Sequence, residues 1–464
     1  MRLLNGLKRP FQIRWVRRVV VGTSAVLLLG IVWLAVDREV ERSNGHRELA
    51  SAIAEADLSD PDWRWEDLNK ARKKPPEGKN SADVIDRVRA ASPPRWFSPE
   101  VPDADTPNRK DTGEAIASIR KQLAASPEAV RLARSLKEYP SGYREAVLDP
   151  SNYFSTYAEA TQNARWAAAT LNWDSRLALA DGEFSQVSDN VLACLNVSRS
   201  IGDDPDSIAQ IIRVSMRGNA TLRLELALAR TGSLPRLAEL QSAWAADAEE
   251  PLFYHAMRGQ RALYDRIFEG IENGTFPLAD FFDKKDDILG RTRSGLPSNR
   301  ATSLRMMTAS VEAAKLPAEQ QGAAFARIPW PDHPPNQLMA ILQLGATSNR
   351  FDSYRRSTAK MRCAIAGLAC ERFRLLQGRW PESLQEIPAA LLAAVPLDPF
   401  DGKLLRYRQL PDGVAIYSVG ANGSDDGGDL HWGARESLDV GFRLWNANAR
   451  NLPPLPPAPK DAAP

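Results

Sequence analysis

The chain has 464 residues, of which 43% are hydrophobic and 25% are charged. This is the composition of a folded protein with a large core, so wholesale disorder is excluded. Three cysteines are too few for a disulfide-rich secreted scaffold, and four scattered histidines argue against a histidine-rich metal enzyme.

The formal net charge is +2, but it is unevenly distributed. Residues 1–18 carry six basic side chains and no acidic one, so residues 19–464 are net acidic. A nucleic-acid-binding protein needs a basic folded surface, and the composition therefore argues against a nucleic-acid partner.

Residues 19–36 contain no charge, and as a helix they span about 27 Å, enough to cross the hydrocarbon core of a bilayer. Trp15 and Trp33 lie where interfacial aromatic residues are expected. The basic cluster of residues 1–18 predicts a cytoplasmic N-terminus, with residues 37–464 on the other side of the inner membrane. A cleaved signal peptide is the alternative, but its apolar core is usually about 7–15 residues and a small-residue cleavage site follows it. No second apolar run is long enough to span a bilayer, so we expect a single-pass anchor, with the lipid bilayer as a partner of residues 19–36.

Residues 37–112 are expected to form a juxtamembrane helix over 37–57 and then a strap over 60–112. Eight prolines exclude a long helix from the strap, while Trp63, Trp65, Trp96 and Phe97 indicate that it packs on a domain. The run Asp62 to Leu68, followed by Pro75 and the Asn80-Ser81-Ala82 triplet, resembles a segment found after the anchor of uncharacterised single-span bacterial envelope proteins. That resemblance implies no particular activity.

The pattern over residues 113–335 is helical, with apolar residues recurring at spacings of three and four. Asp181-Gly182-Glu183 marks a turn between two helices, and further breaks are expected at 202–206, 232–235, 250–251 and 273–277. The 34-residue period of a tetratricopeptide solenoid is not sustained, so the segment is predicted to be a body of irregular helical hairpins. Residues 282–300 are charged and rich in turn formers, and we expect an exposed loop there.

Residues 340–451 are predicted to form a small α+β module with a short antiparallel sheet. A long helix is expected over 349–377, and strands over 404–408, 414–419 and 438–444. Cys363 and Cys370 are two helical turns apart, roughly 10.5 Å, which is too far for a disulfide, so we interpret them as core residues. Six prolines in residues 452–464 predict a disordered tail. The predicted fold class is mainly α, with one N-terminal transmembrane helix.

The search for enzyme motifs is negative: the chain contains no G-x-S-x-G, no phosphate-binding loop, no dinucleotide fingerprint, no H-E-x-x-H and no C-x-x-C. His255 lies among Phe253, Tyr254 and Met257, which favours a partly buried packing role over a general base.

Short motifs follow the predicted long helix in a characteristic order: 377–384 (QGRWPESL), 395–400 (VPLDPF), 405–408 (LRYR), 416–423 (IYSVGANG) and an acidic glycine-rich loop. This order resembles the globular part of the major pseudopilin of type II secretion systems. The resemblance covers about seventy residues, and it implies a calcium site in the loop that follows the strand. Asn422 stands where the family has aspartate, and residues 19–36 lack the pilin N-terminal pattern, so the resemblance implies a shared module without the pilus-assembly role.

The candidate calcium ligands are Asp398, Asn422, Asp425, Asp426 and Asp429. Read without the family, the stretch 398–429 holds six carboxylates, and calcium takes six to eight oxygen ligands in glycine-rich loops. A solvated Asp/Gly turn without an ion explains the same residues, and both interpretations stay open.

The leading hypothesis for function is a non-enzymatic structural or interaction protein of the cell envelope, whose helical body binds another envelope protein. One alternative is a membrane-anchored hydrolase, which needs a deep cleft in 113–330 with a perturbed carboxylate or a placed nucleophile. A second is a secretion-system accessory, which the pseudopilin resemblance implies.

Overall fold

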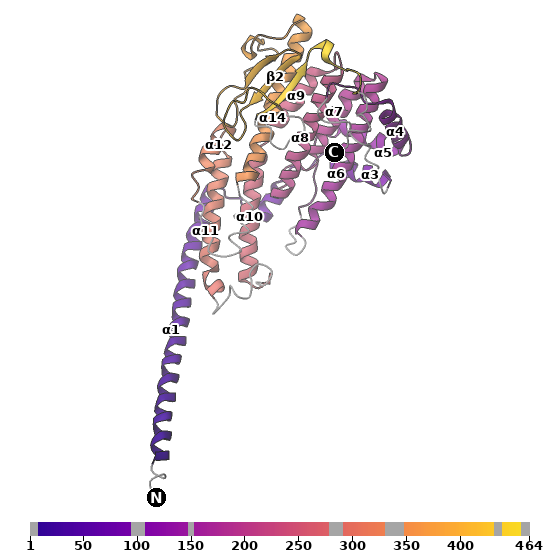
Figure 1. Cartoon of the computed structure of the whole chain (residues 1–464). Helices are drawn as coiled ribbons and strands as arrows, with labels where there is room; N and C mark the ends of the chain where they lie inside the picture. Colours follow the sequence, from indigo (N-terminus) through magenta and orange to yellow (C-terminus); the bar gives the residue numbers. More distant parts are fainter. Residues whose placement is uncertain are drawn as a thin grey trace. The chain divides into compact units, whose positions relative to one another are not determined.

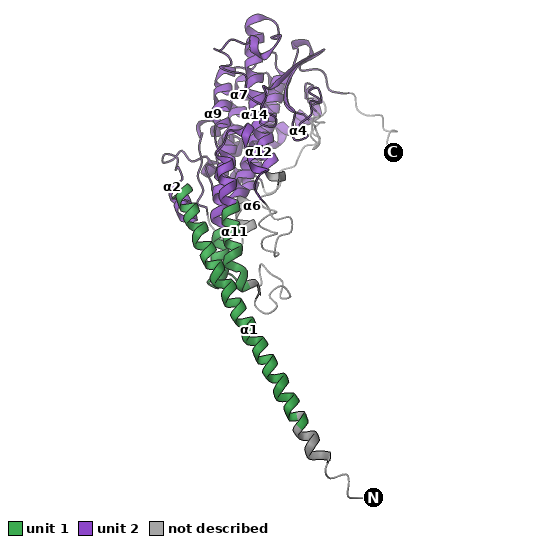
Figure 2. Cartoon of the chain, turned by 90° about the vertical axis from the view of Figure 1, so that its left-hand side faces the viewer, with its two compact units in different colours: residues 1–61, 264–306, 330–343 green, residues 62–263, 307–329, 344–464 purple. Residues whose placement is uncertain are grey.

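The structure is a computed structural model, and it describes residues 8–93, 107–146, 153–277, 291–329, 348–430 and 439–455. It is mostly helical, with a three-stranded sheet near the C-terminal end of the chain (Figure 1). This confirms the predicted fold class. The chain divides into two compact units, coloured separately in Figure 2. Unit 1 comprises residues 1–61, 264–306 and 330–343, and unit 2 comprises 62–263, 307–329 and 344–464.

The first helices are α1 (Lys8–Ser59), α2 (Trp65–Ala71), α3 (Ser81–Ala91), α4 (Gly113–Ala124), α5 (Pro127–Ser135) and α6 (Tyr153–Asp181). They are followed by α7 (Phe184–Arg199), α8 (Ser207–Arg230), α9 (Leu237–Ala248), α10 (Leu252–Glu272), α11 (Arg291–Ala314), α12 (Ala318–Phe325) and α14 (Ser348–Gln377). The strands are β1 (Arg406–Leu410), β2 (Gly413–Ser418) and β3 (Val440–Trp445).

Unit 1 consists of α1, the C-terminal part of α10 and the N-terminal part of α11. Arg305 of α11 forms an ion pair with Glu55 of α1 at 3.0 Å. The two helices approach closely at Gly45, where a side-chain carbon would lie 2.9 Å from the backbone nitrogen of Ser298. Arg300 joins α11 to α10 by pairing with Asp265 at 2.8 Å. Gly45 and the Arg305–Glu55 pair therefore hold α11 against α1, and the Arg300–Asp265 pair holds it against α10.

The main body of unit 2 is a set of helical hairpins, as the sequence predicts. α6 ends at Asp181 and α7 begins at Phe184, and Gly182 between them has φ +78°, a conformation that glycine adopts without strain. α8 packs on both of these helices. The side chains between them, including Leu171, Val191 and Leu224, are fully buried and belong to the large core of unit 2.

The sheet has the order β1-β2-β3, and both neighbouring pairs are antiparallel. α14 packs on β2 and β3 and also on α8 and α9. Gly367 of α14 lies against the ring of Phe442 on β3, and a side-chain carbon at position 367 would be 2.5 Å from that ring. The same buried core runs from α3 to β3, so the helical body and the α+β module share one interior instead of forming the separate domains 113–335 and 340–451.

One sequence prediction is wrong in unit 1. Residues 291–300 were expected in an exposed loop, but they begin α11, where Leu296 is buried. Pro297 lies inside this helix. Packing against α1 outweighs the poor helix propensity of the segment, because tertiary contacts supply most of a helix's stability. The rest of the expected loop, up to residue 290, lies outside the described residues.

The tail prediction also needs a correction. The Leu452 N–H donates to the carbonyl of Asn108 at 2.9 Å, and the Lys110 N–H donates to the carbonyl of Leu452 at 2.8 Å. Arg109 donates to the carbonyl of Pro453 at 2.8 Å. The first tail residues are therefore paired with the 108–110 segment. Prolines in the tail lack an N–H donor, but their carbonyls can still accept hydrogen bonds. Residues 456–464 lie outside the described residues.

Part of the segment predicted as a strap lies within the described residues. Trp63 and Trp65 are buried, and short helices α2 and α3 occupy part of the segment. Trp96 and Phe97 lie outside the described residues.

Candidate functional site

The most distinctive surface of unit 1 is the apolar part of α1. Within the described residues, α1 is the helix that is long and apolar enough to cross a membrane. None of its most apolar stretch is buried, and side chains such as Leu29 are 68% exposed. Soluble proteins rarely expose a contiguous apolar patch of this size, which marks a membrane or partner contact.

Asp398, the first predicted calcium ligand, is fully buried in the turn before β1. Its Oδ1 accepts hydrogen bonds from the Ser418 hydroxyl and the Phe400 N–H, both at 2.8 Å. Its Oδ2 accepts from Arg406 at 2.7 Å and from the Val419 N–H at 2.9 Å. Asp398 therefore ties the turn to the end of β2, and its two oxygens are already used by protein donors.

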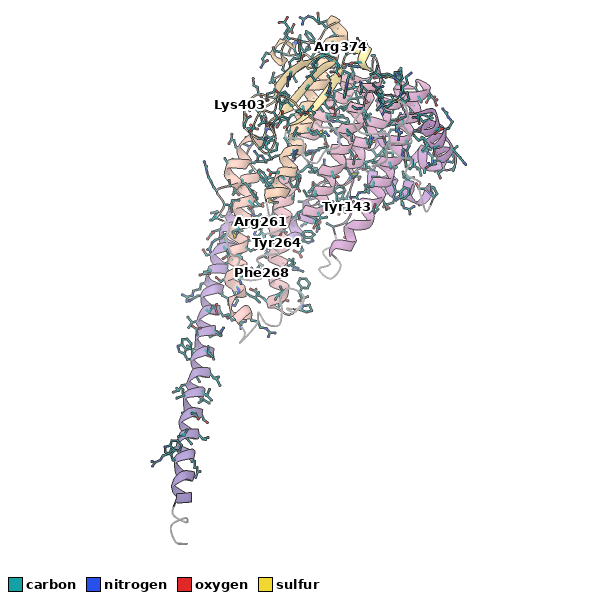
Figure 3. The ribbon with its side chains drawn as sticks, viewed as in Figure 1. Tyr143, Arg261, Tyr264, Phe268, Arg374 and Lys403 are labelled. Atoms are coloured by element: carbon teal, nitrogen blue, oxygen red, sulfur yellow. The ribbon has the colours of Figure 1, made fainter. Side chains whose placement is uncertain are left out.

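The turn that contains Asp398 is stabilised a second time by Asp401. Its carboxylate accepts from the N–H of Lys403, a residue labelled in Figure 3, at 3.0 Å, and it also pairs with Arg406. Burial opposes ionisation of Asp401, but the hydrogen bond from Arg406 outweighs it and holds the pKa below its ordinary value. The carboxylates of this turn are thus balanced by one arginine.

The remaining predicted ligands lie in the loop after β2. Asp425 accepts hydrogen bonds from the Tyr417 hydroxyl at 3.0 Å and from the Gly427 N–H at 2.9 Å. The Asn422 amide donates to Asp426 at 2.9 Å. Asp429 is exposed at the end of the same loop. The structure therefore brings Asn422, Asp425 and Asp426 into one hydrogen-bonded turn.

Sequence reasoning missed Asp439, which also holds this loop. It is fully buried, and its carboxylate accepts from the Gly428 N–H at 2.8 Å. Burial raises the pKa of Asp439. The described residues contain no group of three or more His, Cys, Asp or Glu side chains placed to hold a metal ion. Calcium binding by the loop stays a prediction, and Asp398 would have to break its bonds to take part.

A cleft with a volume of about 610 Å³ opens in unit 2, which we call the α14 cleft. Its walls come from α8, the α9–α10 turn, the α11–α12 turn and α14, through Arg217, Leu252, Phe253, Leu316, Tyr354, Ser357 and Thr358 among others. Ser357 is 8% exposed, and its hydroxyl has no hydrogen-bond partner in the described chain. The cleft thus combines apolar side chains with an unsatisfied hydroxyl and with charged side chains, among them Arg217, Glu250 and Arg362.

Arg217 is held at the cleft by a buried carboxylate. Asp247 is fully buried and pairs with Arg217 at 2.6 Å and with Arg199 at 3.1 Å, while Arg213 lies 3.4 Å away. Burial opposes ionisation of Asp247, but these three arginines outweigh it and hold its pKa below the ordinary value. Burial lowers the pKa of Arg217 to about 10. Both groups are therefore charged at neutral pH, and the pair fixes the position of the guanidinium.

Two carboxyls within 113–330 have strongly raised pKa values. Burial raises the pKa of Glu225 to about 7 and that of Asp204 to about 7. Glu225 accepts a hydrogen bond from the Arg443 N–H at 2.7 Å, and Asp204 accepts from the Asp206 N–H at 2.9 Å. Neither residue lines the α14 cleft. These two perturbed carboxyls are packed into the interior of unit 2, away from the cleft.

The remaining candidate groups behave as packing residues. His255 is half-buried, and burial lowers its pKa to about 4, so it is neutral at physiological pH. Cys363 and Cys370 are free and fully buried in α14, which confirms that they are unpaired core residues. Sequence spacing could not have identified Arg217 or Ser357, because they are brought together with the α9–α10 turn only by long-range packing.

Comparisons with known proteins add no assignment. No family model matches the chain, and no curated protein or solved structure matches it.

Proposed function

We propose that the chain is a single-span membrane protein that holds a non-enzymatic binding unit at the outer face of the cytoplasmic membrane. The observation that carries this proposal is the exposed, uncharged stretch of α1 over residues 19–36. A bilayer removes this apolar surface from water, which is worth about 25 cal/mol per Å². The charged run Asp37-Arg38-Glu39 ends the stretch where the headgroup region would begin.

The orientation rests on the basic residues 1–18. Positive charge flanking an anchor is retained on the cytoplasmic side, so residues 37–464 would be outside. A reporter that is active only outside the cytoplasm should be active when fused after Pro464. A cytoplasm-only reporter should be inactive at the same position, and the opposite pair of results would contradict the orientation.

The binding role is supported by the α14 cleft. Its apolar residues Leu252, Phe253 and Leu316 suit a short peptide segment, and Ser357 and Arg217 provide polar groups that fix such a segment. Of the described residues that line it, none is a histidine or a cysteine. We therefore expect the cleft to bind a segment of another envelope protein without chemical conversion.

A photo-crosslinking residue at Leu316 tests this role in intact cells. We expect it to capture a discrete partner, and we expect Ser357→Trp, which fills the cleft, to abolish the capture. Leu455 is 51% exposed and lies outside the cleft lining, so a crosslinker there is the matched control. Identical products from positions 316 and 455, or products unaffected by Ser357→Trp, would contradict binding in the cleft.

A further inference from the structure

A second cavity in unit 2 lies among α6, α7 and α8 and has a volume of about 220 Å³. Its polar lining consists of Arg165, Asn172, Asn219 and Arg223, and its apolar lining includes Trp173, Met216 and Val197. We call it the arginine cavity. It shares no lining residue with the α14 cleft.

The charge in the arginine cavity is unbalanced. Among the residues that the structure describes, the cavity lining contains two arginines and no aspartate or glutamate. Neither Arg165 nor Arg223 forms an ion pair or a side-chain hydrogen bond with the described residues, in contrast to the paired arginines elsewhere in unit 2. Arg165 is exposed, whereas Arg223 is half-buried. A guanidinium partly removed from water without a counter-charge costs free energy, so the cavity favours an anion at Arg223.

The surroundings of Arg223 add to this excess of positive charge. Arg176 and Arg230 lie close enough to repel it, and both of them pair with the single carboxylate of Asp111, at 2.8 and 3.0 Å. Burial lowers the pKa of Arg223, and repulsion from Arg176 and Arg230 acts in the same direction. Arg176 and Arg230 therefore share one aspartate, and neither brings an additional carboxylate to Arg223.

Cys194 is not the missing counter-charge. It lines the cavity, but burial raises the pKa of its thiol to about 12, so the thiol is neutral at physiological pH.

The amides supply neutral donors in the same cavity. Asn172 is only 8% exposed, and its side chain makes no hydrogen bond with the described residues, although buried amides are normally paired. Asn219 precedes Arg223 by four residues on α8, so the two side chains share one face of that helix. An amide group and a guanidinium together offer the N–H donors that an oxyanion accepts.

We propose that the arginine cavity binds one small oxyanion, a carboxylate or a phosphate, with Arg223 as its main ligand and Asn172 as a second donor. The planar guanidinium matches both groups with two parallel hydrogen bonds. The cavity is larger than the charged group alone, so a small organic substituent can pack against Trp173 and Met216. This site is independent of the membrane anchor and of the α14 cleft, and its failure would leave the proposed function standing.

The test uses the full chain purified in detergent, with thermal unfolding and calorimetric titration against inorganic phosphate, acetate and benzoate at constant ionic strength. We expect a saturable rise in the unfolding temperature with phosphate or with a carboxylate. Binding of phosphate alone assigns the site to phosphate groups, and tighter binding of benzoate than of acetate assigns it to organic acids that use the apolar wall.

Arg223→Met should weaken binding on the order of tenfold to a hundredfold, because it removes a charged hydrogen-bond donor. The same variant should unfold at a slightly higher temperature than the wild type when no ligand is present, since it removes a half-buried charge that has no counter-charge. Asn172→Leu, of similar volume, should weaken binding by a smaller factor. Arg131→Met is the matched control, because Arg131 is exposed and pairs with Glu128 away from the cavity.

The proposal is overturned if none of the three anions produces a saturable shift in the wild type. It is overturned equally if Arg223→Met and Asn172→Leu bind the anion as tightly as Arg131→Met does.

Discussion

Arg450, which follows the sheet, forms a two-fold ion pair with Glu371 of α14, with Nη1 to Oε1 and Nη2 to Oε2 both at 2.8 Å. Both side chains are essentially inaccessible to water. Arg374, labelled in Figure 3, donates to the same carboxylate at 2.7 Å. Burial opposes ionisation of Glu371, but the hydrogen bonds from Arg450 and Arg374 outweigh it and hold its pKa below the ordinary value. The pair therefore fastens the last described segment of the chain to the central helix of unit 2.

Removing one partner of this pair should be severely destabilising. Arg450→Met leaves the Glu371 carboxylate buried with fewer donors, which costs about 3–5 kcal/mol. We expect the unfolding temperature of the full chain to fall by several degrees. The double variant Glu371→Leu, Arg450→Met should recover much of this loss, because neither member of the fully buried pair stays charged and Arg374 keeps its hydrogen bond to the Gly232 carbonyl. A double variant that unfolds as early as the sum of the two single variants would contradict a direct pair.

Asp398 should behave as a structural residue whether or not calcium is present. Asp398→Asn weakens the ion pair with Arg406 and the bonds to the end of β2, and breaking a buried pair costs about 3–5 kcal/mol. Unfolding measured with a chelator present should therefore show a large loss. Asp425→Asn is the control, since that side chain is 51% exposed and its loss should cost under about 1 kcal/mol. If Asp398→Asn and the wild type were equally stable in chelator, the structural role of Asp398 would be contradicted, and calcium binding would be the role left for it.

Two glycines inside helices should respond to alanine in opposite directions. Gly218 of α8 has open space around it, so Gly218→Ala should stabilise the chain by roughly 0.5–1 kcal/mol through helix propensity. Gly367→Ala places a carbon 2.5 Å from the Phe442 ring, and such overpacking costs about 1–3 kcal/mol. Thermal unfolding of the two variants compares them directly. If Gly367→Ala were as stable as Gly218→Ala, the close contact of α14 with Phe442 on β3 would be contradicted.

Stability should decrease as pH rises because of Glu225. Its pKa is about 7 in the folded chain and 4.5 in an unperturbed glutamate. Between these values the folded state holds a proton that the unfolded state has lost, so its contribution is complete below pH 4.5. It declines by at most about 1.4 kcal/mol per pH unit, until it is lost above pH 7.

Glu225→Gln keeps the acceptor for the Arg443 N–H and should make the unfolding temperature less dependent on pH between 5 and 8. Some dependence should persist, because the pKa of Asp204 is raised to about 7 as well. Exposed Glu128 provides the control variant Glu128→Gln, which should keep the wild-type profile. A Glu225→Gln profile that coincides with the wild-type profile would rule out titration of Glu225 in this range.

The regular elements could be predicted from the sequence because each carries its own signal. The apolar spacing of residues 349–377 places α14 within one residue of its observed bounds, and Gly378 ends it with φ +72°. The three strands lie within about two residues of their predicted bounds, since branched and aromatic residues alternate with turn formers there.

The features that could not be predicted depend on residues far apart in the chain. α11 begins in a segment that contains Ser294, Gly295, Pro297 and Ser298, all poor helix formers, and only its packing against α1 explains the helix. Asp247 is 48 residues from Arg199, so no local sequence pattern predicts the ion pair between them. The arginine cavity likewise combines Asn172 and Arg223 from different helices. That Arg223 lacks a counter-charge can be recognised only once the folded structure shows its neighbours.

Membrane extraction tests the central claim most directly. Membranes from cells that express the full chain, and from cells that express residues 41–464, are washed with alkaline carbonate, which removes peripheral proteins. The account predicts that the full chain stays with the membrane until detergent is added, because residues 19–36 supply the length needed to span a bilayer. Residues 41–464 should be recovered in the wash. A full chain that is released by carbonate, or a shortened chain that resists it, would contradict a single anchor in α1.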